Sequence, residues 1–140
     1  GTPGYVPEIN LDYGFSCQTF ARTVGDRIFV PVSMFTSWLS AQKTARHNDL
    51  VIEKGSSGID SISLTVPEGY VVEVLPPETR YDCEAGWYSL AVSEDGGVIR
   101  AELGVGLIPC RLSPDSYSIY RDFTKSFNKV ADSIIVLKKK

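Results

Sequence analysis

The sequence predicts a mainly β domain with one C-terminal amphipathic helix. Residues 62–77 form a strand-like alternation, a Pro67-Glu68-Gly69 turn and a β-branched run that ends at two prolines. Residues 99–107 alternate apolar side chains with polar side chains or glycine, which is typical of a strand with one buried face. Apolar residues then recur at spacings of three and four over residues 114–131, which indicates a helix.

Length and composition limit the classes of function. A chain of 140 residues is the size of one domain and can bury roughly two thirds of its unfolded surface in one core. Its 43% hydrophobic and 22% charged residues are typical of a folded globular domain. A net charge of -3 provides no basic surface for phosphate backbones, and no apolar run is long enough to cross a bilayer. We therefore expect neither nucleic-acid binding nor membrane insertion.

The first ten residues differ from the rest of the chain. They start with glycine and are rich in proline and glycine, so we interpret residues 1–10 as a cleaved-tag scar and a linker. The chain would then be a piece of a longer protein, with residues 11–140 forming a single domain. A missing export signal in such a piece does not predict where the parent protein resides.

Turn residues divide the chain into predicted strands. A two-residue loop, Gly25-Asp26, is expected to join the first two strands in a type II′ hairpin. Residues 54–58 are interpreted as a turn and residues 78–85 as a polar connection. The predicted strands are residues 13–24, 27–32, 50–53, 62–66, 70–75, 86–92 and 99–107, and residues 134–137 are interpreted as a final strand or a core-packed tail.

Two further segments connect these strands. Ser33 is expected to cap a short turn with the i,i+4 pairs Met34–Trp38 and Phe35–Leu39, and residues 40–48 are expected to form a long exposed loop. Before the helix, Ser113-Pro114-Asp115 combines an N-cap, a proline at the first helical position and an acid in the first turn. The predicted buried face of the helix is Tyr120, Phe123, Phe127 and Val130. The final lysines are interpreted as a solvated end.

The sequence contains few patterns that indicate catalysis. It has no Gly-rich phosphate loop, no calcium-loop spacing and no C-x-x-C pair, and His47 is its only histidine. We therefore expect no cofactor and no metal. Cys17, Cys83 and Cys110 are interpreted as small buried apolar side chains; one disulfide with one free thiol is the alternative in an oxidising compartment.

A thiol nucleophile is the sharpest enzymatic hypothesis. Cys17, His47 and then Asp49 or Asp60 follow the chain order cysteine, histidine, aspartate. A nucleophilic cysteine is usually placed at a helix N-terminus, where the helix dipole lowers its pKa, whereas Cys17 lies in a strand-like run. We therefore favour Cys17 as a core residue and His47 as an exposed loop residue.

Aromatic residues provide a second functional hypothesis. Trp38, Trp87 and Tyr88, with Tyr70 and Tyr81, are candidates for a stacking platform such as sugar-binding β-sandwiches use. Aromatic residues in strands are more often core or cross-strand partners, so this carbohydrate-binding alternative is the weaker interpretation.

The chain also resembles a known family. The run Val66-Pro67-Glu68-Gly69-Tyr70, the helix that begins at Ser113-Pro114 and the ending Ile134-Ile135-Val136-Leu137-Lys138 are similar to the C-terminal domain that follows the transglutaminase-like, papain-fold core of multidomain Bacteroidetes proteins. The resemblance covers residues 46–140 well and the first hairpin more loosely. Where the family usually has Arg-x-x-Pro followed by an apolar residue, this chain has Asp49 before Leu50.

The resemblance implies both a fold and a function. It implies an antiparallel, jelly-roll-like β-sandwich with the C-terminal helix packed on it, and it places the catalytic residues in an upstream domain outside this chain. We therefore expect a non-catalytic accessory domain of an exported, periplasmic or cell-envelope protein. Its expected partner is the upstream transglutaminase-like domain, with a protein, peptide or glycan ligand as a further option. Docking predicts a contiguous exposed apolar patch on one face, larger than an ordinary monomer surface shows. The alternatives are a carbohydrate- or peptidoglycan-binding module and, more weakly, a cysteine hydrolase using Cys17 and His47.

Overall fold

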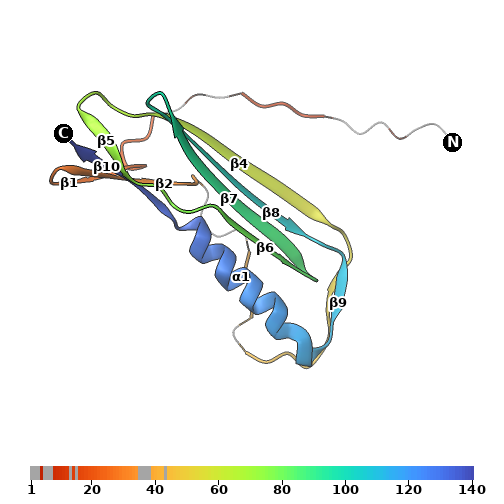
Figure 1. Ribbon diagram of the computed structural model, residues 1–140. Helices are drawn as coiled ribbons and strands as arrows, with labels where there is room; N and C mark the ends of the chain where they lie inside the picture. The colour runs from red at the N-terminus through yellow and green to blue at the C-terminus, as the bar shows by residue number, and fades with distance from the viewer. Residues whose placement is uncertain (1–3, 5–7, 13, 15, 35–38, 43) are drawn as a thin grey trace.

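A computed structural model describes residues 4, 8–12, 14, 16–34, 39–42 and 44–140 (Figure 1). The described residues form a mainly antiparallel β fold with one α-helix near the C-terminus, as predicted. In chain order the elements are β1 (Arg22–Val24), β2 (Arg27–Pro31), β3 (Leu50–Ile52), β4 (Ser56–Thr65), β5 (Tyr70–Val74), β6 (Thr79–Cys83), β7 (Gly86–Asp95), β8 (Val98–Leu107), β9 (Cys110–Leu112), the 3-10 turn η1 (Pro114–Ser116), α1 (Tyr117–Ala131) and β10 (Ile134–Lys139).

The strands form two four-stranded sheets and one short pair. We call the sheet of order β4-β8-β7-β6 the meander sheet, and the sheet of order β1-β2-β10-β5 the terminal sheet. The meander sheet is built on long ladders, because β8 pairs with ten residues of β4 on one side and ten residues of β7 on the other. The pair β3–β9 continues the β4–β8 ladder beyond an interruption.

The helix and the terminal sheet cover the same face of the meander sheet. Figure 1 shows α1 lying along β6 and β7, with the terminal sheet beyond the C-terminal end of the helix. The core therefore consists of one sheet on one side and a helix plus a sheet on the other. Its buried residues come from all three: Leu90, Ile99, Ala101, Leu103 and Val105 from the meander sheet, Phe123 and Phe127 from α1, and Val30, Ile135 and Leu137 from the terminal sheet.

A cluster of aromatic side chains packs α1 against the meander sheet. The Tyr88 ring stacks on Tyr81 with centroids 5.3 Å apart, and it contacts Phe123 at 6.0 Å and Phe127 at 5.8 Å. Such ring pairs add about 0.5–1.5 kcal/mol beyond the area that they bury. Gly86 permits this approach, because a Cβ there would lie 2.9 Å from Phe123 Cζ.

Strand β10 connects the helix directly to the terminal sheet. It begins three residues after α1 ends and pairs with both β2 and β5, so it lies inside the sheet. Its residues Ile135 and Leu137 are buried in the core. The terminal sheet is thus fixed by the segment that directly follows the helix.

The Gly25-Asp26 loop and the helix agree with the predictions from sequence. Val24 pairs with Arg27 across a two-residue loop in which Gly25 has φ 61°. The predicted helix 114–131 corresponds to η1 followed by α1. Ser113 has the extended conformation of an N-cap, although its side chain makes no capping hydrogen bond to the backbone. The predicted buried helix face is confirmed, with Phe123 and Phe127 fully buried.

Several predicted boundaries were wrong. The first strand was expected over residues 13–24 but is only β1, because residues before Arg22 find no strand partner in the described chain. The turn expected at 54–58 is partly β4, since β8 extends the ladder to Ser56. The polar connection expected at 78–85 contains β6, whose alternate residues pack inward despite its polar composition. The short strand β9 was not predicted.

The core role of Phe123 can be tested by truncation. We expect Phe123→Ala to lower the free energy of unfolding by about 3–5 kcal/mol, because it leaves a cavity under Tyr81 and Tyr88. The exposed Lys125→Ala on the same helix should change stability by no more than about 0.5 kcal/mol. Urea denaturation followed by circular dichroism measures both. Equal stability of the two variants would contradict the packing described above.

Candidate functional site

The outer face of the terminal sheet exposes a group of apolar side chains. Directly paired residues of antiparallel strands project to the same side, so the register places these side chains together. We call this group the apolar face; it consists of Val24, Phe29, Pro31, Ile134, Val136 and Val74. Val24 is 51% exposed, Val74 48% and Ile134 40%. This sheet is therefore the candidate location of the apolar patch that docking predicts.

A shallow hollow lies on the apolar face. It has a volume of about 400 Å³ and is lined by Phe20, Arg22, Val24, Phe29, Pro31 and Ile134. Apart from Arg22, these side chains are hydrocarbon, so the hollow suits an apolar side chain of a partner better than a polar ligand. Phe20 reaches it from the segment that precedes β1, which means that the chain enters the domain beside this hollow.

A charged group borders the apolar face. Arg27 on β2 makes two hydrogen bonds to the carboxylate of Glu73 on β5, at 2.7 and 2.9 Å, and so spans β10. The bond from Arg27, together with its charge and that of Lys138, holds the pKa of Glu73 below its usual value. The pair therefore favours the folded state at neutral pH, and this effect is lost as the pH falls through the lowered pKa. Because the pair is exposed, its contribution to stability is small.

A β-bulge shapes the edge of this face. The register between β10 and β5 shifts between Val136 and Leu137, so that Val136 pairs with Val74 but Leu137 pairs with Val72. Bulges interrupt an edge and disfavour the addition of another strand. The face is thus better suited to contact through side chains than to extension of the sheet.

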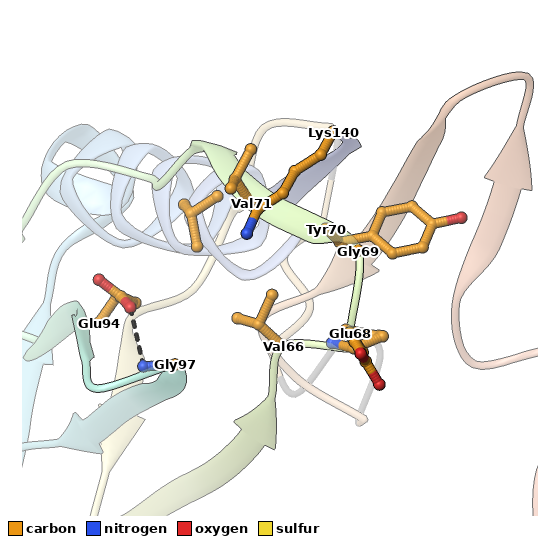
Figure 2. Close-up of a pocket in the computed structure, with 10 residues that line it drawn as sticks. Val66, Glu68, Gly69, Tyr70, Val71, Glu94, Gly97 and Lys140 are labelled. Carbon is orange, nitrogen blue, oxygen red and sulfur yellow. Dashed lines mark hydrogen bonds between the residues drawn. The ribbon is translucent and has the colours of Figure 1, made fainter.

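A second hollow lies where β4 turns into β5, beside the β7–β8 hairpin (Figure 2). Its polar groups are used within the fold: the Gly97 amide donates to Glu94 and the Val66 amide donates to the Gly97 carbonyl, at 3.0 and 2.8 Å. The Lys140 amide donates to the Gly69 carbonyl at 2.8 Å. The turn predicted at Pro67-Glu68-Gly69 is confirmed, with Gly69 at φ 85°. The hollow lies where hydrogen bonds connect this turn region to the β7–β8 hairpin and to the C-terminal residue.

The structure gives no support to the hypothesis that Cys17 and His47 form a thiol nucleophile and its base. Cys17 was expected in the core but is exposed, because the strand predicted around it does not form. Its Sγ lies 3.6 Å from Thr19 Oγ1, and this hydrogen bond lowers the pKa of the thiol. His47 is exposed in the loop before β3, where the neighbouring Arg46 stacks on Tyr117. Within the described residues, no hydrogen bond or ion pair joins Cys17 to His47.

The other two cysteines are only partly buried. Cys83 and Cys110 are intermediate in exposure rather than buried as expected, since they lie at the ends of β6 and β9. Burial raises the pKa of the Cys110 thiol, with a smaller effect from Cys83. All three cysteines are free thiols. Among the described residues, no group of three or more His, Cys, Asp or Glu side chains is placed to hold a metal ion.

No helix in the described part of the chain meets the length and hydropathy that spanning a bilayer requires.

Among the described residues, the predicted aromatic platform is not brought together on one face. Tyr88 is 4% exposed and belongs to the core cluster, and Tyr70 and Tyr81 pack against the same core. Trp38 lies outside the described residues. Trp87 follows Gly86 on β7 and projects to the opposite side from Tyr88, on the outer face of the meander sheet.

Sequence reasoning missed the apolar face itself. The sequence does contain a signal, namely strands that are apolar on both faces. Residues 28–32 are all apolar, and so are residues 134–137. A strand that is apolar on both sides is expected to be covered on both sides. In the structure only one side is covered by described residues.

Thiol reactivity can check the placement of the cysteines. We expect Cys17 to react with a maleimide or disulfide reagent at pH 7 faster than Cys83 and Cys110, because it is exposed and its pKa is lowered. Peptide mass spectrometry at short reaction times measures the three rates. Slower labelling of Cys17 than of Cys110 would contradict its exposed position.

Comparison with known proteins identifies the family. No curated protein and no solved structure matches the chain. Residues 26–137 match the family model described as Domain of Unknown Function with solved-structure structure (DUF3858). The match runs from the β1–β2 loop into β10, so it includes the meander sheet, the helix, β2, β5 and the first part of β10, whereas β1 precedes it. The chain therefore belongs to the DUF3858 family of domains of unknown function.

Proposed function

We propose that this domain is a non-catalytic C-terminal accessory domain of a transglutaminase- or protease-like, exported cell-envelope protein. Its role is to pack through the apolar face against the catalytic domain that precedes it in the same polypeptide, and so to shape access to the substrate cleft. The observation that carries the proposal is the exposure of Val24, Val74 and Ile134 on one outer face, where Arg22, Arg27 and Lys138 lie among the apolar side chains. Exposed apolar patches of this kind mark interaction surfaces.

The chain path supports an upstream partner. Phe20 and Arg22 line the hollow on the apolar face, and β1 is the edge strand of the terminal sheet. A domain attached through the residues before Phe20 would therefore be tethered beside this face. Short tethers raise the effective concentration of the two surfaces, so that a modest patch is enough for docking.

The charged residues around the apolar face predict the chemistry of a complementary partner surface. Glu73 is neutralised by Arg27, whereas Arg22 and Lys138 contribute positive charge at the border of the apolar face. A complementary partner would present an apolar centre with acidic residues around it. Such complementarity selects the orientation of docking more than its strength.

Paired lysine substitutions test the proposal in the complete polypeptide. Ile134→Lys places a charge in the apolar face, and Ile59→Lys is the matched control, since Ile59 is a 63% exposed isoleucine on the meander sheet. We expect only Ile134→Lys to release the domain, seen as faster proteolysis of residues 8–19 and a larger radius of gyration by X-ray scattering.

The isolated domain provides the control for folding. Both lysine variants should keep their unfolding free energy within about 0.5 kcal/mol of the original, because both positions are exposed. Unchanged proteolysis and scattering for Ile134→Lys in the complete polypeptide would overturn docking through this face. Equal release by Ile59→Lys would also overturn it.

A further inference from the structure

We propose that the outer face of the meander sheet binds a neutral polysaccharide, with the indole of Trp87 stacking against a sugar ring. This surface is independent of the apolar face, since it lies on the other sheet and points away from the core. The glycan-binding proposal is therefore tested independently of the docking function.

The indole of Trp87 lies along the backbone of β8. A Cβ built on Gly106 would be 2.3 Å from Trp87 Nε1, and one built on Gly104 would be 3.0 Å from Trp87 Cζ3. Because Nε1 and Cζ3 are on opposite sides of the indole, the ring extends over both glycines. One ring face then rests on the strand, and the other is turned away from the sheet. Glycine at these two positions is what allows this approach.

The surroundings of the ring are mainly polar, with Ile59 as the exposed apolar exception. The strand registers place Arg80, Asp82, Asp95, Arg100 and Glu102 on this face, and Arg80 and Asp82 form an ion pair at 3.1 Å. Hydroxyl groups complete it: Ser57, Ser61, Ser63, Ser89 and Ser93. A flat aromatic ring beside carboxylate, guanidinium and hydroxyl groups matches the apolar ring faces and the hydroxyls of a sugar. Two positive and three negative side chains give this face little net charge, so we infer a neutral glycan.

The length of the surface fits several sugar rings. A hollow of about 470 Å³ lies farther along the same strands, lined on this face by Ser61, Ser63, Ala91, Ser93, Arg100 and Glu102. Trp87 and Ser93 are six positions apart on β7, which corresponds to about 20 Å. The Trp87 ring and the hollow are thus the two ends of one track along β7 and β8, which is too long for a single monosaccharide.

The track is open in the described part of the structure. Both α1 and the terminal sheet pack on the inner face of the meander sheet, so neither covers this side (Figure 1). Ile59, which pairs with Gly104 beside the indole, is 63% exposed. A glycan can therefore reach the Trp87 ring without rearrangement of these elements.

Affinity electrophoresis of this chain tests the proposal. The gels contain a soluble neutral polysaccharide: a mixed-linkage β-glucan, xyloglucan, xylan, galactomannan or pullulan. We expect at least one of them to slow the original chain, and Trp87→Ala to weaken that interaction about tenfold or more through loss of the stacked ring. Isothermal titration with oligosaccharides of the active polymer gives the affinities.

Two more variants separate stacking from folding. Gly106→Ala keeps the tryptophan but its methyl group collides with Trp87 Nε1, so it should also weaken binding. Lys125→Ala on the exposed side of α1 should bind as the original does. Circular dichroism establishes that each variant is folded. The proposal is overturned if none of the five polysaccharides slows the original chain, or if folded Trp87→Ala is slowed as much as the original.

Discussion

The stacking of Tyr88 with Tyr81, Phe123 and Phe127 is the contact on which the rest of the architecture depends. It holds α1 against the meander sheet. Because β10 starts three residues after α1, the same contact sets the position of the strand at the centre of the terminal sheet. The apolar face on that sheet is therefore a consequence of how the helix is packed. A loosened helix would disturb the candidate docking surface from the inside.

The two sheets present outer faces of different chemistry. The terminal sheet exposes Val24, Val74 and Ile134 together, whereas the outer face of the meander sheet carries serines, charged side chains, Trp87 and one large exposed aliphatic residue, Ile59. Exposed hydrocarbon in one patch is typical of protein contacts, and a polar face with a flat aromatic ring is typical of small hydroxyl-rich ligands. If both proposals hold, the domain would lie between a catalytic domain on one side and a glycan on the other.

Sequence patterns predicted the fold class because strong local signals agree with the tertiary structure. The alternation from Ile99 to Leu107, the turn at Gly69 and the helix after Ser113 each depend on neighbouring residues only. The strand β6 could not be predicted, since its polar residues become strand through pairing with β7. Likewise, Cys17 falls outside β1 because a strand-like sequence forms no strand without a partner.

The candidate sites were less predictable for the same reason. Trp87 was identified from its residue type, but its support by Gly104 and Gly106 depends on the β7–β8 register. Tyr88, one position later, projects to the opposite side and into the core. The apolar face likewise combines residues of β1, β2, β5 and β10, which the chain separates by more than a hundred residues.

Hydrogen–deuterium exchange of the complete polypeptide, compared with this chain alone, tests the central claim that the apolar face is covered by an upstream domain. The account predicts slower exchange in β1 and in the adjoining residues 20–21 of the complete polypeptide, with unchanged exchange in β4. Identical exchange of β1 in the two proteins would contradict the account, since an edge strand beside a docked surface must lose solvent access.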